Sequence, residues 1–292
     1  MLKLSVVTPS YNHAEYIEDT LQSVKAQGYP LVEHIVVDGA STDGTCEILK
    51  RYSAQPGWEH LRWISEPDRG QSDAINKGFR MASGDLIAWL NSDDYLLPGA
   101  LQAIAQYAAK YPSMDIVYGD SIFVNKQGNL LRAKKEHRFD FRVLLYYGCY
   151  IQSNTSFYRK HLIDDGLLLQ DSYRVCMDWE YYVRLAANGI TFGYLNRPIA
   201  AFRWQGLNRS LATQQVRKER LQIQDAWSRP RMPHKCYWAL GGVFRMKRAT
   251  MKLLNGGYWE ELRALTYRGI DTRWFRSPGI RHLQGLDRIT GY

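Results

Sequence analysis

The sequence has little of several features that mark common protein classes. Its 292 residues include only 4 cysteines, which are widely scattered, so we expect neither a disulfide framework nor a structural zinc site. The longest apolar stretch in the C-terminal part, CYWALGGVF at 236–244, is far shorter than the ~20 residues that span a bilayer. The chain opens on MLKLSVVTPSYN, which reads directly into a strand, so we expect no secretory leader. These absences favour a cytoplasmic globular protein.

Acidic residues are scarce in the C-terminal part. Residues 203–292 hold 18 Lys and Arg but only 6 Asp and Glu, whereas residues 1–202 hold 20 and 23. The net charge of +9 therefore belongs to the tail, which indicates a local surface for an anionic partner. We expect a catalytic domain at 1–209 and a basic, aromatic-rich helical extension at 210–292.

Two interpretations of this extension stay open. Its mixture of basic and aromatic residues is typical of helices that lie on an anionic membrane surface, where lipid-linked acceptors are found. It is equally typical of a solvated helical cap on the catalytic domain. No nucleic-acid-binding motif accompanies the charge, so no nucleic-acid partner is expected.

Short runs rich in β-branched residues alternate with helical stretches over the first 90 residues. Strands are expected at 4–8, 33–38, 61–65 and 85–90. Helices are expected near 14–27, 43–53 and 71–82. Strand, helix and strand at this spacing predict crossover units, and hence an α/β fold with a mainly parallel sheet flanked by helices.

The remaining pattern is more mixed. It predicts a helix at 98–111, a strand within 115–125, a charged hairpin or loop at 126–138, and strands at 151–158 and 192–204. A helix in DSYRVCMDWEYYVRLAANGI has Asp178 in its first turn, where a carboxylate is electrostatically favoured. After residue 210 we expect a helix, a proline-containing break at 230–233, and further short helices.

Polar residues follow the first four strands, among them Asp38, Asp68, Asp93 and Asp94. Because ligands of open α/β sheets bind outside the carboxyl ends of the strands, we expect these residues to line one crevice. No glycine-rich phosphate loop is present, and carboxylates alone would repel a phosphate. A divalent cation, Mg²⁺ or Mn²⁺, resolves this conflict, because aspartate oxygens bind it and its open positions take phosphate oxygens. The structural alternative for NSDD is a turn in which the Asn and Asp side chains hydrogen-bond to their own backbone.

Several segments together resemble family 2 glycosyltransferases of the GT-A fold. They are VVTPSYNHAEYIEDTLQSVKAQGYPLVEHIVVDGASTDGT, SEPDRGQSDAINKGF and GDLIAWLNSDDYLLPGAL, and the resemblance covers residues 3 to about 210. It implies a Rossmann-like mixed, mainly parallel sheet and a Mg²⁺- or Mn²⁺-dependent enzyme. Such an enzyme transfers a sugar from a nucleotide-diphosphate donor to a hydroxyl acceptor, normally with inversion.

The resemblance also implies roles for residues of the donor site. Thr8, Pro9 and Tyr11 match the first-strand segment that packs around the nucleoside base, and Asp38 matches an acid that reads the base. Gly39 stands where the family often has a second Asp. Asp68 falls where the family contacts nucleotide or sugar. Arg69 and Lys77 are weighed as phosphate contacts against solvated or helix-pairing roles, which are favoured.

The stretch NSDD matches the family's DxD-like motif. Asn91 replaces the usual first Asp, which leaves Asp93 and Asp94 for the metal, with Asn91, Ser92 and Asp93 near the nucleotide-sugar. Asp178 in CMDWEYY matches the catalytic base, although Met177 stands where Glu is common. The alternative for Asp178 is a helix-capping role, and Glu180 is the reserve base.

In AFRWQGLNRS, Gln205 stands where the family often carries a His, which leaves Arg203 or Arg209 as candidate diphosphate contacts. Trp179 and Trp204 are weighed as sugar-stacking residues, but core packing is the favoured reading.

The expected function is sugar transfer, with a UDP-sugar favoured as donor, in the synthesis of a surface polysaccharide, lipopolysaccharide or glycolipid. The expected partners are the nucleotide-sugar, a saccharide or lipid-linked acceptor, and an anionic membrane surface at the cytosolic face. Two alternatives remain: a sugar nucleotidyltransferase, and a degenerate nucleotide-binding scaffold suggested by Gly39, Asn91 and Gln205. The first would need a Gly-rich basic loop that TPSYNHAEY does not offer.

Overall fold

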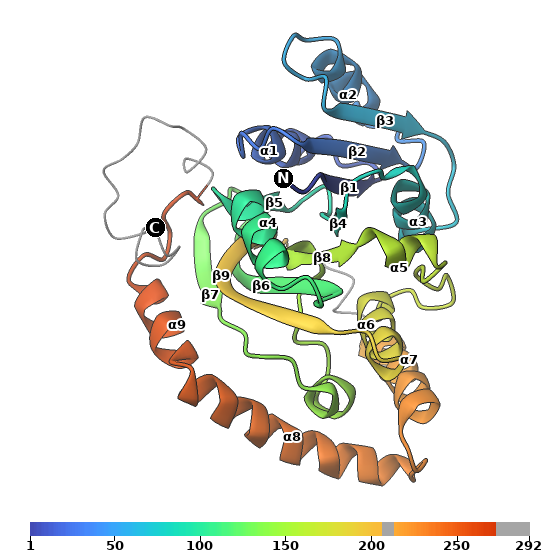
Figure 1. Ribbon diagram of the computed structural model, residues 1–292, viewed down its shortest axis with the longest axis vertical. Coiled ribbons are helices and arrows are strands. Elements are labelled where there is room, and N and C mark those ends of the chain that lie inside the picture. Colours follow the sequence, from blue (N-terminus) through green and yellow to red (C-terminus); the bar gives the residue numbers. More distant parts are fainter. Residues whose placement is uncertain (206–212, 273–292) are drawn as a thin grey trace.

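The computed structural model describes residues 1–205 and 213–272 (Figure 1). Its strands are β1 (Leu4–Ser10), β2 (Val32–Asp38), β3 (Leu61–Ser65), β4 (Leu86–Trp89), β5 (Tyr95–Leu96), β6 (Ile116–Val124), β7 (Leu130–Lys134), β8 (Ser156–Arg159) and β9 (Phe192–Arg203). Its α-helices are α1 (Ile17–Lys25), α2 (Thr45–Ser53), α3 (Gln71–Met81), α4 (Ala100–Lys110), α5 (Lys160–Asp164), α6 (Met177–Ala187), α7 (Thr213–Trp227), α8 (His234–Leu254) and α9 (Gly257–Leu265). Two short turns of helix, η1 (Val143–Tyr147) and η2 (Ser153–Thr155), complete the described elements.

The strands form one sheet in the order β3-β2-β1-β4-β8-β6-β9-β5, with β7 paired to β6. The first four strands of this order are parallel to one another. Strand β8 then runs antiparallel between β4 and β6, and β9 is again parallel to β6. The predicted mixed α/β sheet is therefore confirmed, with the crossover helices where the spacing put them.

Helices cover both faces of the sheet, so its central strands are buried on both sides. Every residue of β1, β4 and β6 is buried, as expected for strands without a solvated face. Val7 on one face of β1 packs in a cluster with Phe79 of α3, and Val6 on the other face packs with Ile104 of α4. This alternation fixes the register of β1 and aims its carboxyl end at the edge where β2 and β4 also end.

Two segments differ from the sequence expectation. Residues 151–158 begin as the η2 turn, and only the last part is strand β8. Short helices were expected after the break at 230–233, but the first helix there, α8, is 21 residues long. The helix continues through Gly241 and Gly242. A Cβ at Gly241 would lie 3.3 Å from the Tyr146 carbonyl oxygen, so this glycine lets α8 approach η1 closely.

The C-terminal helices pack back on the sheet-bearing part rather than leaving it. Helix α7 contacts α6, α8 runs along η1, and α9 returns to β7, so α8 forms the outer edge of the molecule (Figure 1). Asp271, which follows α9, forms a β-bridge with Asn129 of the β6–β7 hairpin, so the end of the described chain returns to the sheet. Among the described helices, none combines the length and apolarity needed to cross a bilayer.

Candidate donor and catalytic site

A cavity of about 660 Å³ opens beyond the carboxyl ends of β1 and β4. Its volume falls in the range typical of small-molecule sites. Most of the residues predicted from the sequence line it: Pro9, Tyr11, Asp68, Asn91, Ser92, Asp93 and Asp178. Thr8, Asp38 and Asp94 are instead buried beneath its wall. The structure thus brings the first-strand segment, the NSDD loop and the start of α6 to one place.

The first-strand segment contributes one apolar wall. Pro9 lines the cavity, and the Tyr11 side chain is 61% exposed, so its ring presents an open face for stacking. Thr8 is fully buried, with its hydroxyl 2.9 Å from His34 Nε2. Its side chain therefore supports the strand and does not reach the cavity, which differs from the predicted base-packing role.

Asp38 ends β2 and holds the loop that follows it. Its Oδ2 accepts hydrogen bonds from the Ser41 backbone N–H at 2.8 Å and the Ser65 hydroxyl at 2.7 Å. Its Oδ1 accepts a bond from the Ser41 hydroxyl. A carboxylate oxygen has two lone pairs, so Oδ1 retains capacity for one further donor beyond these bonds.

Gly39 explains why a second aspartate is absent after Asp38. A Cβ at this position would lie 2.5 Å from Asp68 Oδ2 and 3.4 Å from a ring carbon of Tyr11. The glycine therefore lets the Asp68 side chain lie against the β2 loop. Asp68 is also fixed by the Gly70 backbone N–H, which donates to its Oδ1 at 2.7 Å.

The NSDD loop is oriented by amide groups. The Asn91 Oδ1 accepts bonds from Gln71 Nε2 at 2.8 Å and Trp89 Nε1 at 2.7 Å, and its Nδ2 donates to Asp94 Oδ2 at 3.3 Å. An aspartate at 91 could not donate to Asp94. The replacement of the usual Asp by Asn thus supplies a donor where a third carboxylate would repel the other two.

The two aspartates of this loop have different surroundings. Asp93 lines the cavity, and its Oδ2 accepts a bond from Gln205 Nε2 at 2.6 Å. Asp94 is buried, with Oδ1 accepting from the Arg203 backbone N–H at 2.9 Å and Oδ2 from Asn154 Nδ2 at 3.1 Å. Asp94 therefore supports the loop from behind in this arrangement, and the expectation that both carboxylates hold one metal stays a prediction.

Burial dominates the electrostatics of this pair. It raises the pKa of Asp93, and it raises the pKa of Asp94 well above the usual range, helped by the neighbouring Asp93 charge. Burial disfavours the ionised form of Asp93, and a cation placed beside this carboxylate would offset that cost.

Arg203 lies under the loop instead of facing the cavity. Its side chain is 1% exposed, with Nη2 paired to Asp19 at 2.6 Å and Nε donating to the Asp93 carbonyl at 2.8 Å. The prediction that Arg203 contacts a diphosphate is therefore replaced by a structural role. The alternative candidate, Arg209, lies outside the described residues.

Asp178 enters the cavity from the first turn of α6. Its Oδ1 accepts the Trp179 backbone N–H at 2.7 Å, and its Oδ2 lies 3.9 Å from the Cys149 thiol. Burial raises the pKa of the Asp178 carboxyl from its ordinary 3.8 to about 6. A carboxylate with this pKa is ionised at neutral pH but basic enough to take a proton, which suits general base catalysis.

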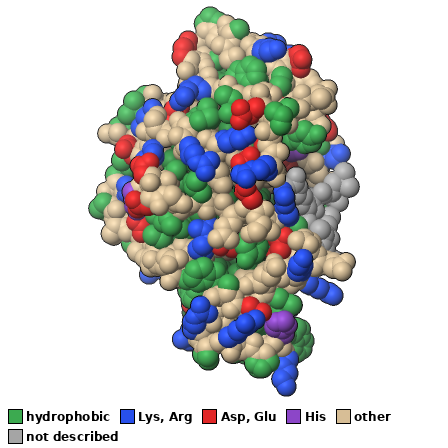
Figure 2. All heavy atoms as spheres, turned by 90° about the vertical axis from the view of Figure 1, so that its right-hand side faces the viewer, with side chains coloured by type: hydrophobic (Ala, Val, Ile, Leu, Met, Phe, Trp, Pro, Cys, Tyr) green, Lys and Arg blue, Asp and Glu red, His purple; other side chains and the backbone are tan. Residues whose placement is uncertain are grey.

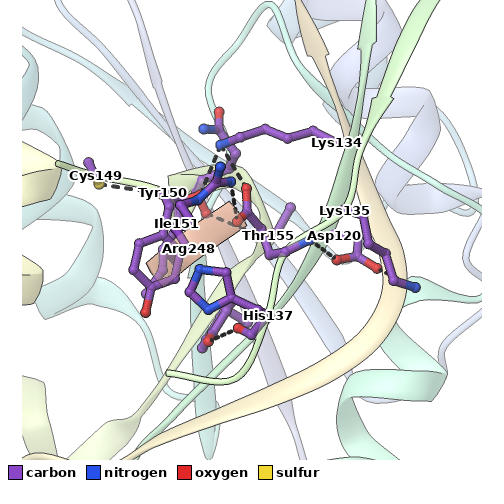
Figure 3. A network of polar contacts seen from close by, with 12 residues as sticks. Asp120, Lys134, Lys135, His137, Cys149, Tyr150, Ile151, Thr155 and Arg248 are labelled. Atoms are coloured by element: carbon purple, nitrogen blue, oxygen red, sulfur yellow. Dashed lines mark hydrogen bonds and ion pairs between the residues drawn. The ribbon is translucent and has the colours of Figure 1, made fainter. Parts of the chain in front are cut away.

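A buried ionic network joins this region to the C-terminal helices (Figure 3). Lys134 Nζ donates to the Tyr150 carbonyl at 2.8 Å and pairs with Glu136 at 3.1 Å. Glu136 in turn pairs with Arg248 of α8 at 2.9 Å. Tyr150 follows Cys149, whose thiol faces Asp178, so α8 is linked through buried charges to the segment beside the carboxyl.

The remaining sequence candidates have structural partners. Arg69 pairs with Asp73 and Asp171, Lys77 with Glu66, and the buried Glu180 with Arg184. Trp179 is 4% exposed and donates from Nε1 to the Leu144 carbonyl at 2.7 Å, and Trp204 packs near Phe202. These contacts agree with the favoured interpretations, in which Arg69 and Lys77 form ion pairs at the surface and Trp179 belongs to the core.

Sequence reasoning gave no role to several polar residues that line the cavity, among them His13, Gln71 and Ser153. His13 Nδ1 lies 2.5 Å from the Ser92 hydroxyl, so it orients the NSDD loop. His13 was visible two residues after Tyr11, in the same loop. Ser153 carried no signal, because its place depends on the η2 turn that the alternating pattern concealed.

The charges around the cavity are unbalanced. Its described lining includes the carboxylates of Asp68, Asp93 and Asp178 but no lysine or arginine. Within residues 1–205 and 213–272, no cluster of three His, Cys, Asp or Glu side chains forms a ready-made metal cage. Among the described residues, an anionic ligand in this cavity would meet no lysine or arginine side chain on the wall.

Known proteins share this architecture. The family model described as glycosyl transferase family 2 matches residues 5–167. A *Mycobacterium bovis* protein named PGL/p-HBAD biosynthesis glycosyltransferase is 28% identical over 217 residues, which are 73% of this chain and 82% of that protein. A *Bacillus subtilis* glycosyltransferase named for teichuronic acid biosynthesis, TuaG, is 45% identical over 91 residues, or 31% of this chain. The match spans only about a third of TuaG, 36% of its length.

Solved structures agree on the fold. *Staphylococcus aureus* TarS 1–349 in complex with UDP-GlcNAc superposes with a TM-score of 0.61 at 21% identity, covering 77% of this chain and 71% of TarS. The *Pyrobaculum calidifontis* mannosyltransferase PcManGT with GDP-Man and Mn²⁺ gives 0.59 at 17% identity, covering 94% and 85%. These likenesses show the GT-A fold. Because the family model covers more than half of the sequence, the chain belongs to glycosyl transferase family 2.

Proposed function

We propose that this protein transfers a sugar from a nucleotide-diphosphate donor to a hydroxyl acceptor with inversion at the anomeric carbon. The observation that carries the proposal is one cavity, lined by three carboxylates and by no described lysine or arginine, in which Asp93 and Asp178 reach from different elements. Asp93 serves the donor diphosphate and Asp178 serves the acceptor. Residues 1–209 form the catalytic unit in this proposal, and residues 210–292 form an extension of it.

A divalent cation fits the residues present. Asp93 offers a carboxylate at the cavity wall, and Mg²⁺ or Mn²⁺ commonly takes one or two protein carboxylates together with phosphates and water. Such an ion would neutralise the charge that develops on the departing diphosphate. The protein contributes Asp93 as the direct ligand, while Asp94 and Gln205 hold the loop and the Asp93 side chain in place.

The nucleotide would occupy the β1–β2 side of the cavity. The exposed ring of Tyr11 and the ring of Pro9 offer a surface for the base, and the buried Asp38 carboxylate holds the adjoining loop through the Ser41 backbone N–H. Asn91, Ser92 and Asp68 lie where ribose and sugar would follow. TarS was solved with UDP-GlcNAc and with UDP, which supports the UDP-sugar that we favour as donor.

Asp178 would act as the base. The ionised carboxylate takes the proton of the acceptor hydroxyl while that oxygen bonds to the anomeric carbon and the diphosphate leaves with the bonding electrons. The Trp179 backbone N–H holds one carboxylate oxygen and leaves the other toward the acceptor.

The acceptor is proposed to be a saccharide or lipid-linked hydroxyl of a surface polysaccharide or glycolipid. The names of the relatives, for teichuronic acid and PGL/p-HBAD biosynthesis, support this class. We place the enzyme in the cytoplasm, peripheral to the cytosolic face of the membrane, where such acceptors are assembled.

Nucleotide binding tests the proposal. Calorimetry with UDP, GDP and dTDP, with and without Mn²⁺, should show metal-dependent binding of one nucleotide that Asp93→Ala removes. Asp164→Ala serves as a matched control, because this exposed aspartate of α5 pairs with Lys160 and does not line the cavity. Failure of every nucleotide to bind under both conditions would reject the proposal. Binding without any hydrolysis of the donor would instead favour the degenerate scaffold.

A further inference from the structure

The outer face of α8 and α9 gathers most of the exposed large hydrophobic side chains. Fourteen such residues are exposed in the described structure, and nine of them lie between residues 238 and 265. Trp238, Leu254 and Trp259 are 86%, 82% and 73% exposed. Single exposed apolar residues are ordinary, but a contiguous group of this kind marks an interaction surface.

The helix register explains how α8 presents this face. Trp238, Met246 and Leu253 follow one another at helical spacing and point outward, whereas Tyr237 and Phe244 pack with the Tyr146 ring of η1. The inward face is thus satisfied by the protein, and the outward face is apolar with no covering element in the described residues. Figure 1 shows α8 at the outer edge of the molecule, away from the sheet.

Basic residues flank this apolar face. Lys235 and Arg245 on α8 and Arg263 on α9 are exposed and make no ion pair with any described residue. The nearby acids are already neutralised, since Glu260 pairs with Lys135 and Glu261 with Lys252. Figure 2 shows basic side chains between hydrophobic ones at the lower end of the molecule, where α8 begins.

We propose that the outward face of α8 and α9 docks on an anionic lipid bilayer. Large apolar side chains beside unpaired cations match the apolar interior and the negative headgroups of such a surface, and tryptophan is favoured at that boundary. A second copy of the chain is a poorer occupant, because a twofold interface would place this basic face against an identical basic face. The helix is an interfacial anchor, not a span, in agreement with its mixed character.

The docking face is held rigidly to the catalytic unit. Buried Glu136 fixes α8 through Arg248, and η1 connects α8 to α6, where Trp179 donates to the Leu144 carbonyl. The bilayer contact would therefore fix the orientation of the helix that carries Asp178. The proposed bilayer contact is inferred from the surface of α8 and α9 alone. Only the idea that this contact helps the enzyme reach a lipid-linked acceptor rests on the proposed function.

Co-sedimentation of the full chain with vesicles tests the proposal. The vesicles are pure phosphatidylcholine, or phosphatidylcholine with phosphatidylglycerol. The basic pair Lys235→Gln and Arg245→Gln should lower the partition coefficient on anionic vesicles about 25-fold, roughly fivefold per charge. The apolar pair Trp238→Ser and Trp259→Ser should lower it about tenfold or more on the same vesicles. Added salt should weaken the wild type on anionic vesicles.

Matched controls come from the catalytic unit. The exposed pair Leu31→Ser and Tyr111→Ser, and the exposed pair Lys50→Gln and Arg80→Gln, should leave vesicle binding unchanged. Failure of the wild type to bind anionic vesicles at low salt, or equal losses in the controls, would overturn the proposal. A dimer in sedimentation velocity that the apolar pair dissociates, without vesicle binding, would assign the face to a second copy. Nucleotide calorimetry on the same variants separates this result from the proposed function.

Discussion

The substitution Asp178→Asn tests the catalytic base through both rate and stability. The amide keeps the oxygen that accepts the Trp179 N–H but cannot take a proton. We expect a fall of about 10²- to 10⁴-fold in turnover, the usual contribution of a general base. In the wild type, kcat/KM should rise with pH through about 6, as the carboxyl loses its proton, and then level off. This acid limb should be absent from the residual activity of the variant.

Stability should move in the opposite direction. The folded-state pKa of about 6 lies above the ordinary 3.8, so the native wild type binds more protons than the unfolded chain between these values and loses stability as pH rises. The difference corresponds to as much as about 3 kcal/mol above pH 6, and Asp178→Asn would recover it. Below pH 3.8 the Asp178 carboxyl is protonated in both the folded and the unfolded wild type, so it should no longer make the wild type less stable than the variant.

Urea unfolding at pH 5 and pH 7.5 measures this effect. The variant should gain stability over the wild type, and the gain should be larger at pH 7.5. The matched control is Glu180→Gln on the same helix, which breaks a buried ion pair with Arg184. It should lose stability and keep the acid limb of the rate profile. If Glu180→Gln removes the acid limb and Asp178→Asn does not, our assignment of the base is wrong.

Two further substitutions, Arg248→Met and Trp179→Phe, test structural roles, and Lys247→Met is the control for the first. Arg248→Met should cost about 2 kcal/mol of unfolding free energy, because it leaves the buried carboxylate of Glu136 short of one charged donor. Lys247→Met, which breaks an exposed pair, should cost under ~1 kcal/mol in the same urea titration. Trp179→Phe should cost about 1–3 kcal/mol by leaving the Leu144 carbonyl without its donor, yet leave nucleotide affinity unchanged in calorimetry. A specific loss of donor binding in Trp179→Phe would restore the sugar-stacking reading.

The crossover half of the fold could be predicted because its signals are local. Each strand of the first 90 residues has its own β-branched run, and each helix has its own period, so β1 to β4 were placed to within a few residues. The crevice at their carboxyl ends followed from topology alone. In the structure, Tyr11, Asp68, Asp93 and Asp178 all line one cavity at this edge of the sheet.

Side-chain direction was beyond the sequence pattern. Asp93 and Asp94 are adjacent and chemically alike, but only long-range partners decide which one faces the cavity: Arg203 and Asn154 hold Asp94 inward. The close approach of α8 to η1 at Gly241 is likewise a contact between distant parts of the sequence.

The measurement closest to the central claim is the stereochemistry of donor hydrolysis. It requires no knowledge of the acceptor, because water can take the place of the acceptor hydroxyl. The nucleotide found by calorimetry defines the donor series, and proton NMR follows the first sugar released in the presence of Mn²⁺. Our account predicts that this sugar has the anomeric configuration opposite to that of the donor, at a rate that Asp178→Asn lowers by about 10²-fold or more. Release with the donor's own configuration, or the same rate in Asp178→Asn, would contradict it.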